Sequence, residues 1–367
     1  MPSDKQKIID GSAWHEFCDA LKETGDAILR PETPNDAFSR AEGFRYLTRL
    51  LRVGLESNVE FSDPRFPVFY SLAHETAKIG NDNPDNFYQN CNVSGQYDYR
   101  IVGSRGTVPY LSIETKAGHY GTTGGMAPTG HIDSSDLEIA PDGSFEIIVS
   151  ATPRPGNWLP MQTQTDNLLV RQTFHDRRSE TKAVLHIECL NAAGNNYLQA
   201  EAFVEQLRNT TNFVRATSNI FVDWMAGYSK HINQLPADDQ ARCQAAGGDS
   251  SIYYLQSYWQ LAADEALVIN AQQIPRCRTW NFQLSNFWME SLDYRYHKIA
   301  VNKHTAHYED DGSVKIVVAH EDPGPRYPNW LTTANHELGG MLFRWVEADE
   351  HPPVKTSVVK LADLGKR

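Results

Sequence analysis

The sequence predicts a mainly β protein with helices (α+β), built as two related antiparallel β-sandwich-like halves that helices join and cover. Two regions alternate apolar and polar residues and favour β-branched and aromatic types. Helical periodicity precedes each region, and one segment of the first recurs in the second. The 367 residues exceed what one hydrophobic core usually serves. With 40% hydrophobic and 22% charged residues, the chain is expected to fold throughout.

The N-terminal segment is expected to be helical. Residues 13–30 carry apolar side chains at helical spacing, and Pro31 ends the pattern. A second, amphipathic helix is expected over 36–58, with Asn35 or Asp36 as its N-cap. The apolar residues that recur on one face of this second helix are Phe38, Phe44, Leu47, Leu51 and Leu55.

The first β region follows turn chemistry at Asn81. Its alternating runs predict strands, and the glycine-rich stretch 118–130 lacks periodicity, which predicts a loop that could cover a cavity as a mobile flap. The predicted strands lie within 97–103, 108–116, 137–140, 141–151, 167–174 and 183–190.

A helix that could be broken in two is expected over 196–234, where Pro is absent and Gly227 is the one glycine. Strands resume within 266–272, 279–289, 313–320 and 341–348. The domain boundaries that follow are an N-terminal helical segment at 1–80, a first β domain at 81–195, a central helical connector at 196–250 and a second β domain at 251–367.

An internal repeat is the strongest pattern in the chain. Residues 142–174 align with 311–345: each segment has an Asp-Gly-Ser turn, an alternating strand, a Pro/Arg-rich loop, Asn-Trp-Leu and a final strand with an arginine, Arg171 or Arg344. Trp158 and Trp330 of the Asn-Trp-Leu elements are interpreted as scaffold because both copies keep them. The two arginines are interpreted in the same way. The repeat predicts a duplicated sheet unit.

The second half, with its Trp-Asn-Phe-Gln-Leu, Asp-Gly-Ser and Asn-Trp-Leu elements, resembles the bacterial domain of unknown function 1214. The first half, with YDYRIVGSRGTVPYLSIE and RPGNWLP, is similar to the domain of unknown function 1254 or to a second copy of 1214. The resemblance covers about residues 81–350 and implies paired β-sandwich domains with intervening helices. It implies no settled activity.

The charge and cysteine content limit the binding partners and the cellular location that we expect. The formal net charge of -12, without a dense Lys/Arg run, argues against nucleic acid binding. The polar N-terminus and the absence of a long apolar run argue against secretion and membrane insertion. Five scattered cysteines form no CxxC motif, which favours a reducing, cytoplasmic location. Exposed edge strands favour a homodimer.

No cofactor or metal is expected. The chain has no GxSxG, GxxxxGK[ST] or GxGxxG motif. His304 and His307 form an HxxH that could share a metal only within a turn, and His119 and His131 flank the glycine loop. For all four histidines, polar loop residues are the preferred interpretation.

The remaining candidates are ionisable groups within aromatic strands. The catalytic candidates are Tyr294, Arg295, His297 and Glu290, which could serve as acid, base or anion stabiliser. The substrate-binding candidates are Tyr99, Arg100, His119, Trp288, Tyr296 and His320. The competing structural interpretation pairs Glu290 with Arg295 between sheets and places the tyrosines in the core.

Three functions stay open. The first is a cofactor-independent enzyme acting by acid/base chemistry on a hydrophobic hydroxylated aromatic (phenolic, lignin-derived) or steroid-like molecule, most simply a lyase that performs an elimination or retro-aldol-type cleavage. The second is a non-catalytic binding protein for an apolar small molecule. The third is a structural protein whose duplicated sheets form an interaction surface.

Overall fold

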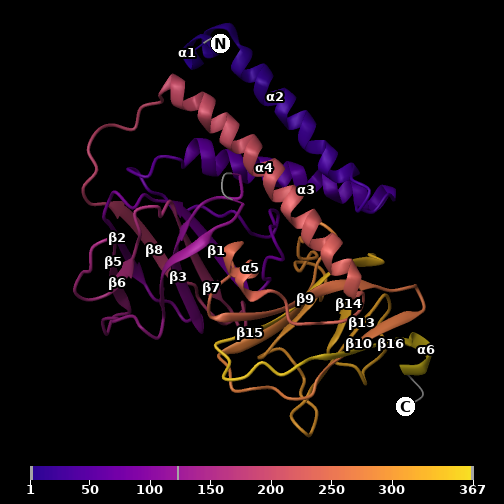
Figure 1. Ribbon diagram of the computed structural model, residues 1–367. Coiled ribbons are helices and arrows are strands. Elements are labelled where there is room, and N and C mark those ends of the chain that lie inside the picture. Colours follow the sequence, from indigo (N-terminus) through magenta and orange to yellow (C-terminus); the bar gives the residue numbers. More distant parts are fainter. Residues whose placement is uncertain (1–2, 122–123, 365–367) are drawn as a thin grey trace.

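Two β-sandwiches lie side by side beneath a layer of long helices (Figure 1). The computed structural model describes residues 3–121 and 124–364. Each sandwich contains two four-stranded sheets. The mainly β, two-halved architecture predicted from the alternating runs and the repeat is confirmed.

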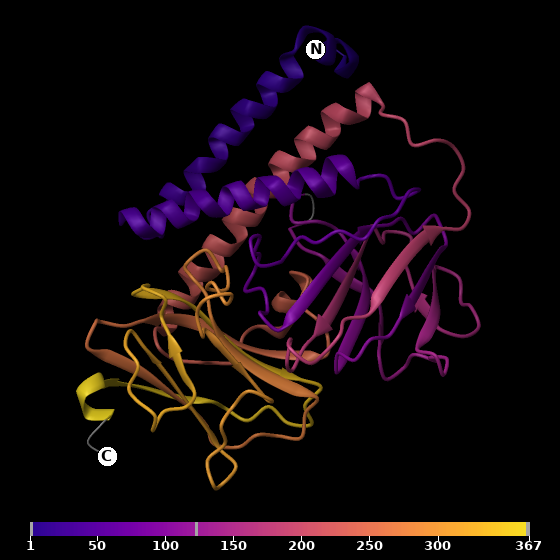
Figure 2. The ribbon, with the colours of Figure 1, turned by 180° about the vertical axis from the view of Figure 1, so that it is seen from behind.

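The helical layer is formed by α4 and the N-terminal helices, which pack against it (Figure 2). Contrary to the expectation that it could be broken, α4 is continuous over its whole length. The helices are α1 (Asp4–Asp10), α2 (Ser12–Thr24), α3 (Ala37–Leu55), α4 (Ala200–Tyr228), α5 (Gln240–Ala245) and α6 (Leu361–Leu364). Shorter helical turns are η1 (Gly25–Leu29), η2 (Glu56–Glu60, a π-helix) and η3 (Ser229–His231).

The start of α3 agrees with the sequence pattern, but its buried face does not. Asp36 is the N-cap, since its side chain accepts a hydrogen bond from the Ser39 amide. Phe38 and Phe44, expected on the buried face, are 46% and 45% exposed. The helix instead buries a stripe that begins at a glutamate, because a histidine of the second sandwich pairs with that carboxylate. The stripe consists of Glu42, Gly43, Tyr46, Leu50, Val53 and Gly54.

The first sandwich pairs the sheet β1-β7-β3-β4 with the sheet β6-β5-β2-β8. All neighbouring strands are antiparallel except β5 and β6. The strands are β1 (Asn86–Asn92), β2 (Tyr99–Ser104), β3 (Tyr110–Ala117), β4 (Ala127–Asp133), β5 (Ser144–Ser150), β6 (Trp158–Pro160), β7 (Asn167–Thr173) and β8 (Val184–Cys189).

The second sandwich has the same plan, with sheets β9-β15-β11-β12 and β14-β13-β10-β16. Here too one pair, β13 and β14, is parallel. Strand for strand, β9, β15, β11 and β12 correspond to β1, β7, β3 and β4. The strands are β9 (Ile252–Gln260), β10 (Glu265–Ala271), β11 (Thr279–Leu284), β12 (Ala300–Asn302), β13 (Val314–Ala319), β14 (Trp330–Thr332), β15 (Leu338–Val346) and β16 (Lys355–Lys360).

The Asp-Gly-Ser turns have the same conformation in both copies. Asp142 accepts hydrogen bonds from the amide and hydroxyl of Ser144, and Asp311 does so from Ser313. The glycine that follows each aspartate has a φ of 84° or 81°, a left-handed conformation that glycine adopts without strain.

The Asn-Trp-Leu elements also match. The Asn157 side chain donates to the carbonyls of Glu138 and Glu146, and the Asn329 side chain donates to those of His307 and Lys315. Each tryptophan indole, in turn, donates to the carbonyl that ends the preceding strand. The repeat is therefore one structural unit used twice, and its tryptophans serve the scaffold, as expected.

Several strands escaped the sequence pattern. β1 and β9 carry Asn, Gln and Ser among their aromatic residues, and β4 contains Pro128 and Gly130. None of the three therefore shows the regular alternation of apolar and polar residues that predicts a half-buried strand. β16 was also missed. Conversely, residues 137–140 form no strand, and β11 ends at Leu284 instead of continuing to Met289. The expected loop at 118–130 is shortened by β4, and its residues 122–123 lie outside the described part of the chain.

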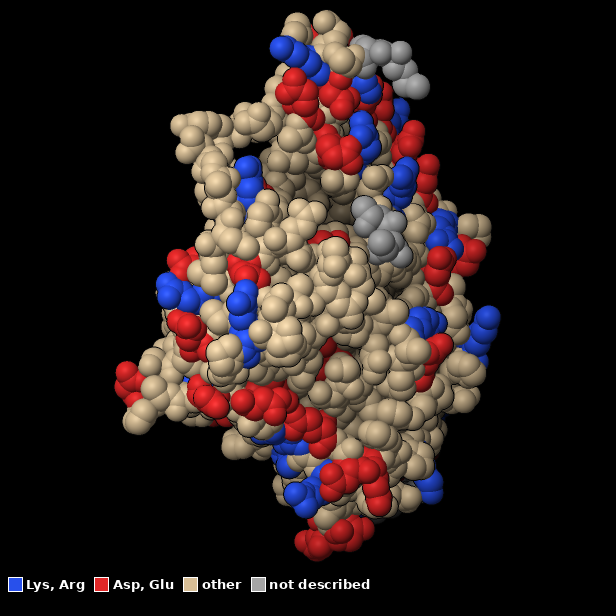
Figure 3. All heavy atoms as spheres, turned by 60° about the vertical axis from the view of Figure 1, so that its left-hand side comes forward, with Lys and Arg blue, Asp and Glu red and all other residues tan. Residues whose placement is uncertain are grey.

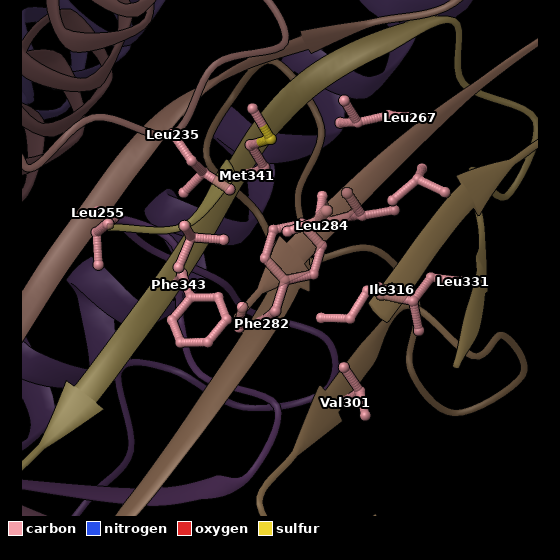
Figure 4. Packing of buried hydrophobic residues seen from close by; sticks show 14 of the residues in the cluster. Leu235, Leu255, Leu267, Phe282, Leu284, Val301, Ile316, Leu331, Met341 and Phe343 are labelled. Carbon is pink, nitrogen blue, oxygen red and sulfur yellow. The ribbon is translucent and has the colours of Figure 1, made fainter. Parts of the chain in front are cut away.

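Each sandwich has its own apolar core, and a third core joins the helices to the second sandwich. Figure 4 shows part of the second sandwich core, where Phe282 and Phe343 lie between the two sheets together with Ile316 and Leu331. Trp288 belongs to the third core, in which it packs beneath α3.

Acidic and basic side chains are interspersed on the face shown in Figure 3, without a broad basic patch. This agrees with the acidic composition of the chain. Among the described residues, no helix has both the length and the apolar character that crossing a bilayer requires.

Candidate functional site

A cavity of about 130 Å³ lies where the two sandwiches meet. Strands β1 and β7 form one side of it, and β9 and β15 form the other. Side chains of α4 and of the segments around 72–82 and 246–248 complete the lining. In Figure 1, α4 crosses above both sandwiches and α5 lies between them. The polar side chains that line the cavity include Asn81, Asp82, Asn86, Asn90, Arg171, Gln256 and Arg344.

Two arginines from equivalent strands make reciprocal contacts in this cavity. Arg171 on β7 donates from Nη2 to the carbonyl of Gly247, in the segment that leads into the second sandwich. Arg344 on β15 donates from Nη2 to the carbonyl of Asn81, in the segment that leads into the first sandwich. Each sandwich therefore completes the arginine site of the other, and the pair links the two halves.

Equivalent tyrosines flank the arginines on the neighbouring strands. Tyr88 is the register partner of Arg171, and Tyr254 is that of Arg344. The Tyr88 hydroxyl accepts a hydrogen bond from the Asn83 amide, and the Tyr254 hydroxyl accepts one from the Asp249 amide, both at 2.9 Å. Burial raises the pKa of both phenols. They consequently remain neutral and act as fixed hydrogen-bonding groups.

The Arg171 site is an ion-pair cluster. The guanidinium contacts the carboxylate of Glu114 on β3 and lies 3.6 Å from Asp249. Lys116 Nζ lies 3.0 Å from the same Glu114 carboxylate, and all four side chains are buried. Two cations therefore face two anions. Burial disfavours the charged form of Arg171, but the two carboxylates outweigh it and raise the pKa of this guanidinium.

The Arg344 site has the same geometry without the carboxylates. Its guanidinium donates to the side-chain oxygens of Gln283 and Asn281 on β11. Asn281 in turn donates to Asn83 at 2.8 Å, as Ser112 donates to Asp249 at 2.9 Å in the first site. Since these partners are neutral, burial lowers the pKa of Arg344.

The register of the sheets makes the comparison between the two sites direct. Arg171 pairs with Ser112 and Arg344 pairs with Asn281, so Glu114 and Gln283 are equivalent positions two residues further along β3 and β11. Asp249 and Asn83 are likewise equivalent, five residues before the two tyrosines. Both carboxylates of the first site are amides in the second.

Apolar side chains provide the rest of the lining. Phe221 and Trp224 come from α4, and Tyr120 and Met126 flank residues 122–123 of the glycine-rich stretch. The Tyr120 hydroxyl donates to the carbonyl of Ala246. Cys243 also lines the cavity, and burial raises the pKa of its thiol, which favours the protonated form. The cavity thus combines apolar walls with a few buried polar groups.

The residues predicted as catalytic lie elsewhere. Glu290 and His297 line a separate hollow of about 230 Å³ between α3 and the second sandwich. Glu290 pairs with Arg49 at 2.6 Å and accepts a hydrogen bond from Asn286, so the expected alternative pairing with Arg295 is wrong. Burial raises the pKa of Glu290. Arg49 could not be predicted as a partner from the sequence, because it lies 241 positions before Glu290, whereas Asn286 lies only four positions before it.

Tyr294 and Arg295 are not part of that hollow's lining. The Tyr294 ring packs under Lys78, whose ammonium lies 4.5 Å from the ring centroid. Arg295 forms a half-exposed pair with Asp293 two residues before it, at 2.6 Å. A local turn brings these two together, since adjacent charged residues in a turn can pair without long-range packing. The catalytic roles assigned to the residues from 290 to 297 stay predictions.

The six predicted substrate-binding residues are dispersed. Tyr99 is buried in the first sandwich and donates to the Pro64 carbonyl. Arg100 pairs with Glu188 on the outer sheet. The Trp288 indole donates to the Ser39 carbonyl. The structure does not bring this set into one pocket.

The other three lie at the surface or in separate loops. Tyr296 is 77% exposed. His119 Nε2 lies 3.4 Å from Asp166, and His320 Nδ1 lies 3.0 Å from the Thr333 hydroxyl.

The histidine pairs considered for metals do not form a metal site. His304 stacks against His175 at 6.2 Å between ring centroids, and His131 lies 3.5 Å from Ser112. Across residues 3–121 and 124–364, no three His, Cys, Asp or Glu side chains are grouped so that they could hold a metal ion.

The sequence contained one signal for the cavity, which was interpreted as scaffold. Arg171 and Arg344 stand at equivalent places in the repeat. Extending the comparison to the strands before them places Glu114 against Gln283, a charge difference inside a conserved geometry.

Comparisons with known proteins identify the repeat unit. The family model described as "Protein of unknown function (DUF1214)" matches twice, at residues 89–174 and 260–350. Of the two alternatives for the first half, the match supports a second copy, while a likeness to domain 1254 stays a prediction. No curated protein matches the chain.

The solved structures that are similar to this chain include the following two. An uncharacterized protein from Burkholderia cenocepacia is 52% identical, with a TM-score of 0.96 over 98% of this chain and 99% of that one. A protein from Vibrio parahaemolyticus is 11% identical, with a TM-score of 0.49 over 86% of this chain and 97% of that one.

Proposed function

Because the chain belongs to the DUF1214 family and carries its domain twice, we propose that it binds a small molecule of about one ring in the cavity that the two copies enclose. The observation that carries this proposal is the cavity itself, with Arg171 and Arg344 in its lining. Interfaces between domains are a common location for ligand sites. Here the cavity lies at such an interface, beside the buried ion-pair cluster of Arg171.

The volume limits the size of the ligand. An apolar cavity of about 150 Å³ can hold benzene, and this cavity measures about 130 Å³. A single aromatic ring is therefore of suitable size, whereas a steroid is too large for the cavity as it stands. The aromatic side chains Phe221 and Trp224 in the lining favour contacts with a flat apolar ring.

A lyase at the same cavity is the second candidate, favoured by the carboxylate of Asp82. Asp82 lines the cavity together with Arg344, and it is held by hydrogen bonds from the Ser291 amide and hydroxyl at 2.9 and 2.8 Å. A fixed carboxylate can take a proton from a bound ligand, and a guanidinium can stabilise the phenolate or enolate that results. In this second candidate function, the proposed catalytic groups are Asp82 and Arg344 in place of Glu290 and His297.

Calorimetric titration tests binding with single-ring probes: benzoate, benzamide, phenol and benzyl alcohol. We expect at least one of them to bind, and we expect Ile79→Trp to abolish that binding by filling the cavity that Ile79 lines. Val68→Trp is the control, because Val68 is 46% exposed and lies outside the cavity lining. Failure of all four probes to bind at millimolar concentration would contradict the proposal.

Turnover separates the two candidates. If Asp82 is a catalytic base, Asp82→Asn should remove turnover of a hydroxylated aromatic substrate while binding persists. Binding without turnover across a panel of phenolic compounds favours the binding protein.

A further inference from the structure

We propose that the ligand of this cavity is a small carboxylate, anchored by Arg344. The inference rests on the proposed function and adds the chemical class of the ligand. The observation behind it is the difference between the two equivalent arginine sites: the protein supplies carboxylates to Arg171 and only neutral oxygens to Arg344.

The first site shows which partner this arrangement accommodates. There the guanidinium is held by a backbone carbonyl of the opposite half and faces Glu114 and Asp249. In the second site the backbone carbonyl is retained, in Asn81, and the anions are missing. The same strands, tyrosine and backbone carbonyl are thus present, and the negative charge alone is absent from the contacts of Arg344.

The charge of Arg344 has no direct counterion. Among the described residues, no carboxylate lies within 4 Å of its guanidinium, although it is only 5% exposed. Asp82 and Asp85 are the acidic groups that act on it from further away. Asp82 is held by Ser291. A buried cation without a direct counterion is unfavourable in itself, and an entering anion would relieve this cost.

Arg344 also retains capacity to bind. A guanidinium has five N–H donors, and its bonds to Gln283, Asn281 and Asn81 use three of them. Arg344 lines the cavity, and we expect its remaining donors to bond a ligand held there. Guanidinium and carboxylate form strong, paired hydrogen bonds of matching geometry. An apolar body of about one ring then remains for the aromatic lining.

Titration calorimetry with benzoate and its neutral isostere benzamide tests the class. We expect benzoate to bind at least about tenfold more tightly than benzamide. We expect Gln283→Glu, which gives Arg344 the partner that Arg171 has, to reduce this preference to about onefold while benzamide binding persists. Asn83→Asp, which places a carboxylate at the position equivalent to Asp249, is an independent variant with the same expected result.

Gln172→Glu is the matched control. Gln172 is also a fully buried glutamine, but it bonds to Ala183 and does not line the cavity. We expect its preference for benzoate to be unchanged, and circular dichroism establishes that each variant is folded.

The outcomes separate the two proposals. If benzoate and benzamide bind equally well to the unmodified protein, the carboxylate inference is overturned and the binding function stands. If benzoate is preferred but both Gln283→Glu and Asn83→Asp retain the preference, Arg344 is not the anchor. If none of the single-ring probes binds, the proposed function itself fails.

Discussion

Glu114 and Gln283 occupy equivalent positions in the two sandwiches, and each contacts the buried arginine of its own half. The first contact is an ion pair and the second is a hydrogen bond to a neutral amide. Duplicated domains are free to diverge, and here the two sites differ in charge at Glu114 and Gln283, while the arginine, its backbone carbonyl partner and the neighbouring tyrosine are retained. Both sites link the two halves through a backbone carbonyl, and the second site leaves a cation without a carboxylate contact in the lining of the cavity.

The two arginines should differ in their contribution to stability. Arg171→Met leaves Glu114 paired with Lys116 and leaves Asp249 without an ion pair among the described contacts, and breaking a buried ion pair costs about 3–5 kcal/mol. Arg344→Met removes a cation without a direct counterion and leaves only neutral oxygens unpaired, which costs about 1–3 kcal/mol. We expect Arg171→Met to lower the free energy of unfolding more than Arg344→Met does, as measured by denaturant titration.

Equal losses would show that the two sites are energetically alike and would contradict their assignment to different tasks. The measurement is made without added ligand, because a bound carboxylate would itself stabilise the protein through Arg344.

The repeat could be predicted from the sequence because its turn residues have strong local preferences. Asp-Gly-Ser and Asn-Trp-Leu form the same hydrogen bonds in both copies, so short-range chemistry specified these segments. The strands β1 and β9 could not be predicted in this way. Their polar residues are buried at the junction of the sandwiches, where partners from distant segments satisfy them.

The candidate site could not be predicted from the sequence for a related reason. The ionisable residues from 290 to 297 are close in the sequence, but Glu290 turns to Arg49 while Tyr296 faces solvent. The cavity instead joins residues that are far apart, such as Asn81 and Arg344. Only the reciprocal packing of the two halves brings these segments together.

The contact between α3 and the second sandwich should depend on pH. His336 Nε2 lies 2.9 Å from the Glu42 carboxylate. Burial alone would lower the pKa of His336, but the hydrogen bond to Glu42 and its negative charge raise this pKa above 6.5. Because the folded state holds the proton more tightly than the unfolded state, the pair stabilises the protein fully below pH 6.5. The stabilisation is lost as the pH rises through the raised pKa.

We therefore expect the difference in unfolding free energy between the unmodified protein and His336→Gln to be larger at pH 5.5 than at pH 9. His186→Gln is the control for the loss of an imidazole, since His186 is exposed on β8 and forms no ion pair among the described contacts. A difference that grows with pH would contradict the pairing.

Asn157 and Asn329 should contribute unequally to the stability of the protein, although they form equivalent hydrogen bonds. Asn157 and Asn329 each bond two carbonyls and one amide of the backbone. Asn329 is only 3% exposed, whereas Asn157 is partly exposed. Unsatisfied buried groups cost about 1–3 kcal/mol, and water can replace bonds that are exposed.

We expect Asn329→Ala to lower the unfolding free energy by about 2–3 kcal/mol and Asn157→Ala by about 1 kcal/mol. Thermal and denaturant unfolding measure both. A larger loss for Asn157→Ala would mean that burial does not determine the value of these bonds.

Gly43 on α3 provides a test of packing against helix propensity. Alanine normally favours a helix over glycine by about 1 kcal/mol. A Cβ at position 43, however, would lie 2.6 Å from the Trp288 ring and 2.8 Å from Ile28, and Trp288 is held in place by its hydrogen bond to Ser39. Overpacking of this kind costs about 1–3 kcal/mol. We expect Gly43→Ala to destabilise the protein by about 1–2 kcal/mol.

Gly227 on α4 is the matched control, because a Cβ there meets no atom within 4 Å. Gly227→Ala should therefore stabilise the protein by about 0.5–1 kcal/mol through helix propensity alone. Opposite signs for the two substitutions, measured by denaturant titration, would establish that Trp288 serves to dock α3 on the second sandwich. Stabilisation by both would instead mean that the indole shifts to accommodate the added methyl group and does not fix the position of α3.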